Sequence, residues 1–91
     1  KDLSNFTVPS FVKRGDLLLR VSTGGKSPSL SRKIRKDLEE VYDDSYEEYV
    51  KLLGQAREMI IENTSDIKER RKRLKELLDL SFDELRRIIK L

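Results

Sequence analysis

The chain has 91 residues, and 41% of them are Asp, Glu, Lys or Arg. It contains no Cys and no His, which excludes disulfides, zinc-thiolate sites and iron–sulfur ligation and removes the commonest general base. No apolar run approaches the roughly 20 residues of a membrane span, and no leader-like stretch opens the chain. We therefore expect one small cytoplasmic domain with no membrane partner. Its core is marginal at this length, so a second copy or a neighbouring domain is expected to cover part of it.

Charge is segregated along the chain. Residues 1–36 carry nine Lys or Arg and two Asp or Glu, whereas residues 37–62 carry two and nine. Residues 63–91 carry nine and six, so the three segments have net charges of +7, −7 and +3. A basic head indicates an anionic partner. Packing of basic segments against acidic ones, within or between subunits, is the alternative.

Two apolar runs near the start of the chain predict a β-hairpin. The β-type residues between Phe6 and Thr23 flank a turn cluster over residues 13–16, which includes Gly15. Pro9 has no amide hydrogen, so it belongs at a strand start, an edge or a bulge. Neither run alternates cleanly between apolar and polar residues. The hairpin is therefore expected to need cover on both faces, with helices on one side.

A loop rich in glycine and hydroxyl side chains follows the hairpin. Ser27 fits the cap of a helix that begins at Pro28, and consecutive amides at a helix start can cradle an anion. The candidate donors in the loop are Ser22, Thr23, Gly24, Gly25, Lys26 and Ser27. The hairpin cations expected nearby are Lys13, Arg14 and Arg20. The spacing of a P-loop is absent, and an ordinary strand-to-helix turn is the alternative.

From residue 29 onward the apolar residues recur at helical spacing. The first predicted stripe is Leu30, Ile34, Leu38 and Val41. A Ser45–Glu48 capping box predicts a second helix, with the stripe Tyr46, Tyr49, Val50, Leu53, Ala56 and Ile60. Gly54 interrupts that helix at a cost of roughly 1 kcal/mol against Ala. Close approach of another helix is one reason to tolerate it.

A break at residues 63–65 precedes a third, very polar helix. Its predicted stripe is Ile67, Leu74, Leu77 and Leu78. Residues 80–85 combine a cap, a capping box and a hydrophobic staple, which predicts a short last helix with Ile88 and Ile89. The predicted fold is α+β and mostly α. A hairpin and glycine-rich loop occupy residues 1–28, and a bundle of three to four helices occupies residues 29–91.

Two charged clusters in the helical part are candidates for chemistry. Paired carboxylates occur at 39/40, 43/44 and 47/48, but no EF-hand spacing is present. The basic run Arg70–Arg73 has no aromatic residue between its cations, so it is a weak signal for nucleic-acid binding. A solvated helix face explains the carboxylates, and a solvated face or an acidic neighbouring helix explains the basic run. We expect no metal site and no nucleic-acid partner.

Residues 5–40 closely resemble the siroheme synthase family, which comprises precorrin-2 dehydrogenases, some of which are also sirohydrochlorin ferrochelatases. The ordered pattern consists of NFTVPSFVKRGDL at 5–17, VSTGGKSPSL at 21–30 and IRKDLE at 34–39. Residues 66–71, DIKERR, look like the acidic-to-Arg-rich helix of the same family. The remaining helical part resembles the family more loosely.

The resemblance implies an NAD-dependent oxidation of precorrin-2 to sirohydrochlorin in siroheme biosynthesis, with iron as a substrate where the enzyme also chelates. In this family NAD is bound by an N-terminal Rossmann domain, and the Asp assigned as catalytic lies just before the segment that matches Lys1. We therefore expect no catalytic and no cofactor-binding residue in these 91 positions. The segment alone is expected to be inactive.

The resemblance also implies a role for each segment. The hairpin is expected to pair with that of a second subunit, and the loop at 22–28 to line the tetrapyrrole cleft beside the Rossmann domain. Precorrin-2 carries eight carboxylates, which suit a basic, amide-rich loop. The residues expected to hold those carboxylates are Lys13, Arg14 and Lys26, with hydrogen bonds from Thr23 and Ser27. The rival interpretations are a non-catalytic helical dimerisation module and, less strongly, a nucleic-acid module.

Overall fold

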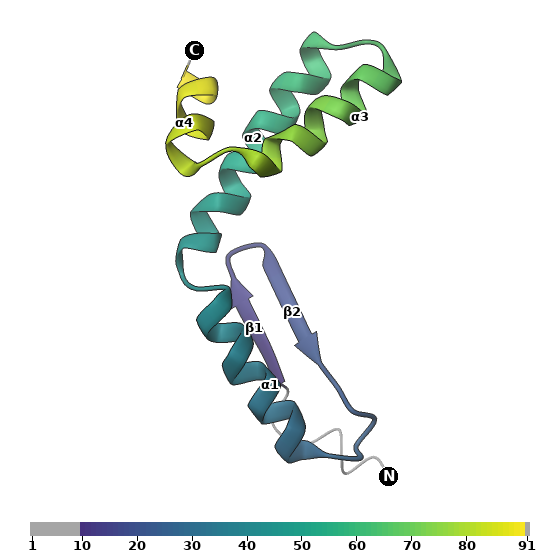
Figure 1. The fold of residues 1–91 in the computed structure, drawn as a ribbon, viewed down its shortest axis with the longest axis vertical. Coiled ribbons are helices and arrows are strands. Elements are labelled where there is room, and N and C mark those ends of the chain that lie inside the picture. Colours follow the sequence, from purple (N-terminus) through teal and green to yellow (C-terminus); the bar gives the residue numbers. More distant parts are fainter. Residues whose placement is uncertain (1–9, 91) are drawn as a thin grey trace. The chain divides into compact units, whose positions relative to one another are not determined.

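The computed structural model describes residues 10–90, in which a two-stranded hairpin precedes four α-helices (Figure 1). The strands are β1 (Ser10–Arg14) and β2 (Leu17–Val21). The helices are α1 (Pro28–Val41), α2 (Ser45–Asn63), α3 (Ile67–Glu76) and α4 (Phe82–Lys90), with a short 3₁₀ helix, η2 (Leu77–Asp79), before α4. The predicted α+β, mostly helical class is confirmed. The predictions for Phe6 and Pro9 lie outside the described residues.

The chain divides into two compact units, one ending at Glu47 and the other beginning at Glu48. The first unit holds the hairpin and α1, so it extends beyond the segment 1–28 that the sequence groups with the hairpin. The second unit holds most of α2 together with α3, η2 and α4. Each unit has its own packing.

The hairpin is antiparallel, and its register runs from Ser10 opposite Val21 to Arg14 opposite Leu17. The tight turn depends on Gly15, whose φ of 63° lies in the left-handed region. A Cβ atom at this position would also lie 2.7 Å from Cγ of Glu47. Glycine is therefore required at the turn for both its backbone angle and its small size.

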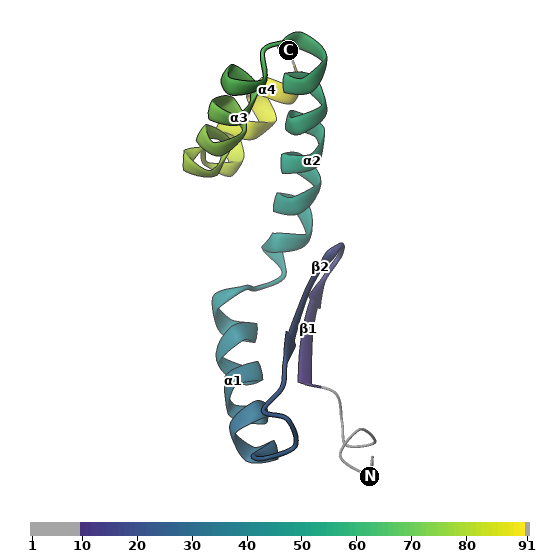
Figure 2. The same cartoon turned by 90° about the vertical axis from the view of Figure 1, so that its right-hand side faces the viewer.

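Burial alternates along both strands, although the sequence does not alternate cleanly. Val12, Leu17, Leu19 and Val21 are buried or half-buried, because α1 packs on this face of the hairpin (Figure 2). On the opposite face, the side chains of Phe11 (43% exposed) and Leu18 (45% exposed) lie beside the exposed Lys13 and Arg20. The prediction that helix covers one face is confirmed, and the other face remains partly apolar in this single chain.

The face that α1 turns toward the hairpin differs from the predicted stripe. Ile34 and Leu38 are half-buried as predicted, but Leu30 (46% exposed) and Val41 (63% exposed) are not covered. Ser31 is buried instead. Its small side chain lies on the same face as Leu38, one helical position from Leu30, so the covered face is rotated relative to the apolar stripe.

The second unit has a compact apolar core. Leu52 and Ala56 of α2 are buried together with Leu77 of η2 and Leu85 of α4. The half-buried residues packed around them are Tyr49, Leu53, Ile60, Leu74, Leu80, Phe82 and Ile89. Most of the predicted stripe of α2 is therefore confirmed, whereas the sequence did not single out Leu52. Two residues of the stripe predicted for α3, Ile67 and Leu78, are exposed.

The helix starts show where the predicted caps were right. The capping box of α4 is confirmed: Ser81 N donates to Glu84 Oε1 (2.8 Å) and Glu84 N donates to Ser81 Oγ (3.2 Å). The predicted box at Ser45 is wrong, because Ser45 is already the first residue of α2. Its backbone N donates instead to the Asp43 carboxylate at 3.0 Å, so an acceptor two residues earlier occupies the capping role.

Gly54 has no close neighbour among the described residues. It is exposed, and a Cβ built on it meets nothing within 4 Å among the described residues, so the expected close approach of another helix is not found there. We expect Gly54→Ala to stabilise the second unit of the dilute monomer by about 0.5–1 kcal/mol, measured by hydrogen exchange of the α2 amides. The matched control is the neighbouring exposed Gln55→Ala. Destabilisation by Gly54→Ala alone would contradict this expectation.

Candidate functional site

The loop between β2 and α1 folds around two glycines. A tight turn closes with a hydrogen bond from Lys26 N to Thr23 O (3.2 Å), and its central residues, Gly24 and Gly25, have φ of 66° and 79°. Two consecutive positive φ angles are open to glycine and are strained for other residues. The Gly-Gly pair therefore sets the path of the chain between strand and helix.

The hydroxyl groups of the loop bond mainly within it. Thr23 Oγ1 accepts from Ser27 N (2.9 Å) and donates to Ser27 O (3.2 Å), and Ser31 Oγ donates to the same Thr23 oxygen at 3.5 Å. Ser27 Oγ caps α1 by accepting from Leu30 N at 3.2 Å, which confirms the predicted cap. The Thr23 proton is thus already used by the loop itself.

Several donors remain directed to solvent. Within residues 10–90, the Gly25 amide and the Lys26 ammonium donate to no protein atom, and both residues are exposed. Ser22 Oγ accepts from Gly24 N at 3.1 Å, and Ser27 Oγ also acts as an acceptor, so each hydroxyl keeps its own proton for another partner. The positive end of α1 begins at the same place, and the first turn of α1 contains no acidic residue. These groups together suit an anion.

Two of the hairpin cations are not beside this loop. Lys13 and Arg14 lie at the turn end of the hairpin, whereas the loop follows Val21 at the opposite end. The expectation that they lie near the loop within one chain is therefore wrong, because an antiparallel hairpin separates its turn from its open end. Lys13 Nζ donates to Gly15 O at 2.6 Å. Arg20 is one residue from the open end, on the exposed face.

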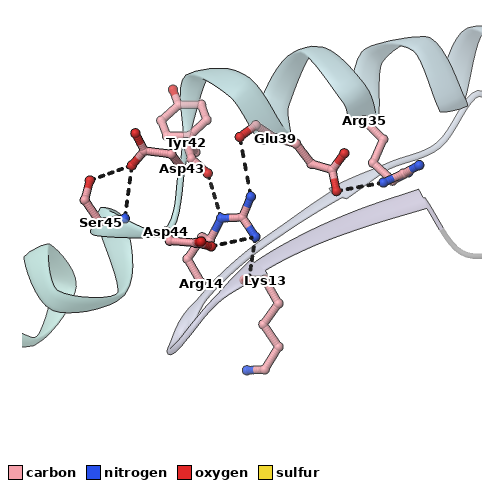
Figure 3. Close-up of polar contacts among 8 residues, drawn as sticks. All are labelled: Lys13, Arg14, Arg35, Glu39, Tyr42, Asp43, Asp44 and Ser45. Carbon is pink, nitrogen blue, oxygen red and sulfur yellow. Dashed lines mark hydrogen bonds and ion pairs between the residues drawn. The ribbon is translucent and has the colours of Figure 1, made fainter.

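Arg14 instead caps the C-terminal end of α1 (Figure 3). Its Nε donates to Tyr42 O at 2.8 Å, its Nη2 donates to Glu39 O at 3.4 Å, and its Nη1 lies 3.7 Å from Asp44 Oδ1. The last turn of α1 contains no basic residue of its own, so the strand supplies the cation that the helix end favours. Asp43 is adjacent to Asp44. Hydrogen bonds from the hydroxyl and the amide of Ser45 lower the pKa of Asp43, and Arg14 makes a smaller contribution in the same direction.

We expect Arg14→Met to loosen the end of α1. The substitution keeps much of the apolar stem but removes the donors to two helix carbonyls, for a loss of about 1 kcal/mol. Hydrogen exchange of the amides of residues 40–45 would show this as faster exchange. The matched control is Arg20→Met on the exposed hairpin face. Equal effects of the two substitutions would contradict the capping role of Arg14.

Comparison with known proteins identifies the region that contains this loop. Residues 14–40 match the family model described as "Sirohaem biosynthesis protein central". Over these residues the chain is similar to the central region of the siroheme synthase family. The matched segment begins at Arg14, includes the whole of the glycine-turn loop and ends at Glu40 near the end of α1. The residues that build the candidate anion site are therefore inside the matched region.

Individual relatives of this siroheme synthase region agree. The chain is 39% identical over 70 residues to a siroheme synthase of Xylella fastidiosa, covering 77% of this chain and 15% of that protein. It is 31% identical over 77 residues to a precorrin-2 dehydrogenase of Methanosarcina barkeri, covering 85% and 34%. A solved structure titled "SirC, precorrin-2 dehydrogenase" has a TM-score of 0.79 and 32% identity, covering 94% of this chain and 45% of that one. The chain thus spans less than half the length of each of these relatives.

Outside the family match, two of the four cations in the basic run of α3, Arg70 and Arg73, have partners within the second unit. Arg70 Nε and Nη2 donate to Thr64 O at 3.1 and 2.8 Å, and Nη2 also donates to Ile61 O at 3.3 Å. Arg73 Nη1 donates to Thr64 Oγ1 at 3.3 Å and its Nε pairs with Glu69. Arg70 thereby caps the C-terminal end of α2. Sequence reasoning missed this role, although a helix break followed by an arginine in the next helix is a usable signal.

Two further findings concern metal ligands and membrane-spanning helices among the described residues. Within residues 10–90, no three His, Cys, Asp or Glu side chains converge as a metal site would require. No helix among the described residues has the length and apolar character needed to cross a membrane. The exposed donors of the glycine-turn loop remain the strongest candidate binding site.

Proposed function

We propose that this chain supplies the tetrapyrrole-binding loop and the dimerisation hairpin of an NAD-dependent precorrin-2 dehydrogenase. The reaction is the oxidation of precorrin-2 to sirohydrochlorin in siroheme biosynthesis. The observation that carries the proposal is the loop at 22–27. Gly25 and Lys26 are exposed at the positive end of α1, and the Gly25 amide and the Lys26 ammonium donate to no protein atom within residues 10–90. The loop lies inside the family match.

The chemistry of the loop fits a polycarboxylate. The Lys26 ammonium and the Gly25 amide would each hold a carboxylate oxygen of the tetrapyrrole, because charge-assisted hydrogen bonds are the strong ones. The hydroxyl protons of Ser22 and Ser27 are available to a second oxygen, whereas Thr23 and Gly24 shape the loop. In this proposal the loop binds and orients the substrate and does no chemistry itself.

The hairpin is proposed to pair with that of a second copy. It is a two-stranded sheet, and its uncovered face exposes Phe11 and Leu18. Such a sheet is marginal alone and is stabilised by further strands. In a two-fold antiparallel pairing, the turn of one hairpin lies beside the open end of the other. Lys13 of the second copy would then reach the loop, while Arg14 remains on α1.

NAD and iron are assigned outside these residues. The described sheet is antiparallel and two-stranded, so it lacks the parallel strand–helix–strand unit that holds a dinucleotide. NAD would accept hydride from the tetrapyrrole while bound to another part of the enzyme. Where the enzyme also inserts iron, the ion is a substrate taken by the ring nitrogens.

The loop is tested by titrating the chain with sirohydrochlorin and following its absorbance. We expect saturable binding that weakens about tenfold in Lys26→Glu, which replaces one attraction by a repulsion and corresponds to roughly 1.4 kcal/mol. Lys72→Glu is the matched control, because it makes the same charge change at an exposed position of α3. Equal weakening in both variants would show that only net charge matters. It would remove the loop as the binding site.

A further inference from the structure

Two exposed helix faces of the second unit have the same spacing and opposite charge. On α2, Gly54, Glu58 and Glu62 are exposed at i, i+4 and i+8; on α3, Ile67, Arg71 and Lys75 are exposed at the same spacing. Residues so spaced share one side of a helix. We propose that the α2 face of one copy docks on the α3 face of a second copy. This contact is separate from the hairpin pairing proposed above.

The α2 face is acidic and has no side chain at Gly54, its N-terminal end. Gly54, Glu58 and Glu62 are exposed, on the side of the helix opposite the buried Ala56. Among the described residues nothing lies within 4 Å of a Cβ placed on Gly54, and neither glutamate forms an ion pair. Ile61 is half-buried and does not belong to the core cluster. A helix that packed here would meet no side chain at Gly54 and the two carboxylates of Glu58 and Glu62 beyond it.

The α3 face is apolar with basic flanks. Ile67 is 61% exposed, and Leu78, just beyond the helix on the same side, is 64% exposed. They are the two most exposed large apolar side chains described in this unit. Arg71 and Lys75 are exposed and, within residues 10–90, form no ion pair, whereas Arg70 donates to the Thr64 carbonyl. In the proposed contact, the apolar side chains of the α3 face pack at Gly54, and its cations pair with the carboxylates of the α2 face.

A second copy fits these faces better than an unrelated partner. Each copy carries both an acidic and a basic face, and in the proposed pair a two-fold axis makes the contact twice. Opposite charges then meet on both sides, Glu58 and Glu62 against Arg71 and Lys75, and electrostatic complementarity fixes the pairing. Gly54 has no side chain, so it allows the two helices to approach closely at that point. No contact among the described residues otherwise explains a glycine there.

The experiment must separate this contact from the hairpin. Leu18→Glu places a charge on the exposed hairpin face and serves as the background for sedimentation over a range of concentrations. In that background we expect reversible dimers that weaken in Arg71→Glu by roughly threefold to tenfold, because each reversal acts twice. Adding Glu58→Arg to Arg71→Glu restores opposite charges and should recover most of the affinity. Gly54→Leu, which adds a side chain at the point of close approach, should weaken the dimer.

One control variant and three outcomes test the α2–α3 contact. Lys72→Glu lies outside the face and should leave association unchanged. A Leu18→Glu chain that stays monomeric at every concentration would overturn the α2–α3 contact while leaving the hairpin proposal intact. Failure of Glu58→Arg to rescue Arg71→Glu, or an equal loss in Lys72→Glu, would also overturn it.

Discussion

Leu85→Ala is expected to destabilise the second unit by about 3 kcal/mol. Leu85 is fully buried in the cluster of Leu52, Ala56 and Leu77, and removing such a side chain loses its transfer free energy and leaves a cavity. Hydrogen exchange of amides in α2, α3 and α4 would report the loss as a fall of roughly a hundredfold in protection. The amides of the hairpin and α1 belong to the other unit and should change little.

Leu78→Ala is the matched control for this substitution. Leu78 is 64% exposed, so the same chemical change there should shift stability by no more than about 0.5 kcal/mol in dilute protein. A loss at Leu78 as large as that at Leu85 would contradict the core assigned to this unit.

Arg70→Met is expected to cost about 2 kcal/mol. The guanidinium donates three hydrogen bonds to the carbonyls of Thr64 and Ile61, and hydrogen bonds from a charged donor each stabilise more than neutral ones. Its loss leaves carbonyls at the end of α2 without these donors in a part-buried setting. The amides of the last turn of α2 and the first turn of α3 should show the largest gain in exchange rate.

The neighbouring Arg71→Met tests whether charge alone explains the effect. Arg71 is exposed and has no partner among the described residues, so its replacement changes net charge equally without removing a cap. In dilute protein it should alter stability by less than about 0.5 kcal/mol. If the two methionine variants lost the same stability, the cap would not be what Arg70 contributes.

The elements of this fold were predictable because local spacing determines them. The cap at Ser27 and the box at Ser81 and Glu84 each use partners within three residues, so the sequence displays both ends of the bond. The cap at Ser45 was wrong because Asp43 offers a competing acceptor nearby. Sequence spacing alone does not decide which of two adjacent acceptors the backbone reaches.

The long-range features were not predictable from one sequence. Arg14 bonds to a carbonyl 28 residues away, and which carbonyl it meets depends on how α1 packs on the hairpin. The same packing buries Ser31 and leaves Leu30 exposed. For the candidate site, the sequence indicated the glycine turn and the Ser27 cap, which the structure contains; binding by the loop stays a prediction. The sequence did not reveal that the hairpin carries Lys13 and Arg14 to the opposite end, or that Thr23 bonds inward.

The inward bonding of Thr23 has a consequence for the speed of ligand capture. Thr23 and Ser27 hold each other through backbone and hydroxyl groups, so the loop proposed to bind the tetrapyrrole already has its shape in the protein alone. A preorganised receptor loses little conformational entropy on association. Capture of a polyanion should then proceed at a rate set by electrostatic steering, falling as ionic strength rises, while the exchange of the loop amides with solvent stays nearly the same with and without ligand.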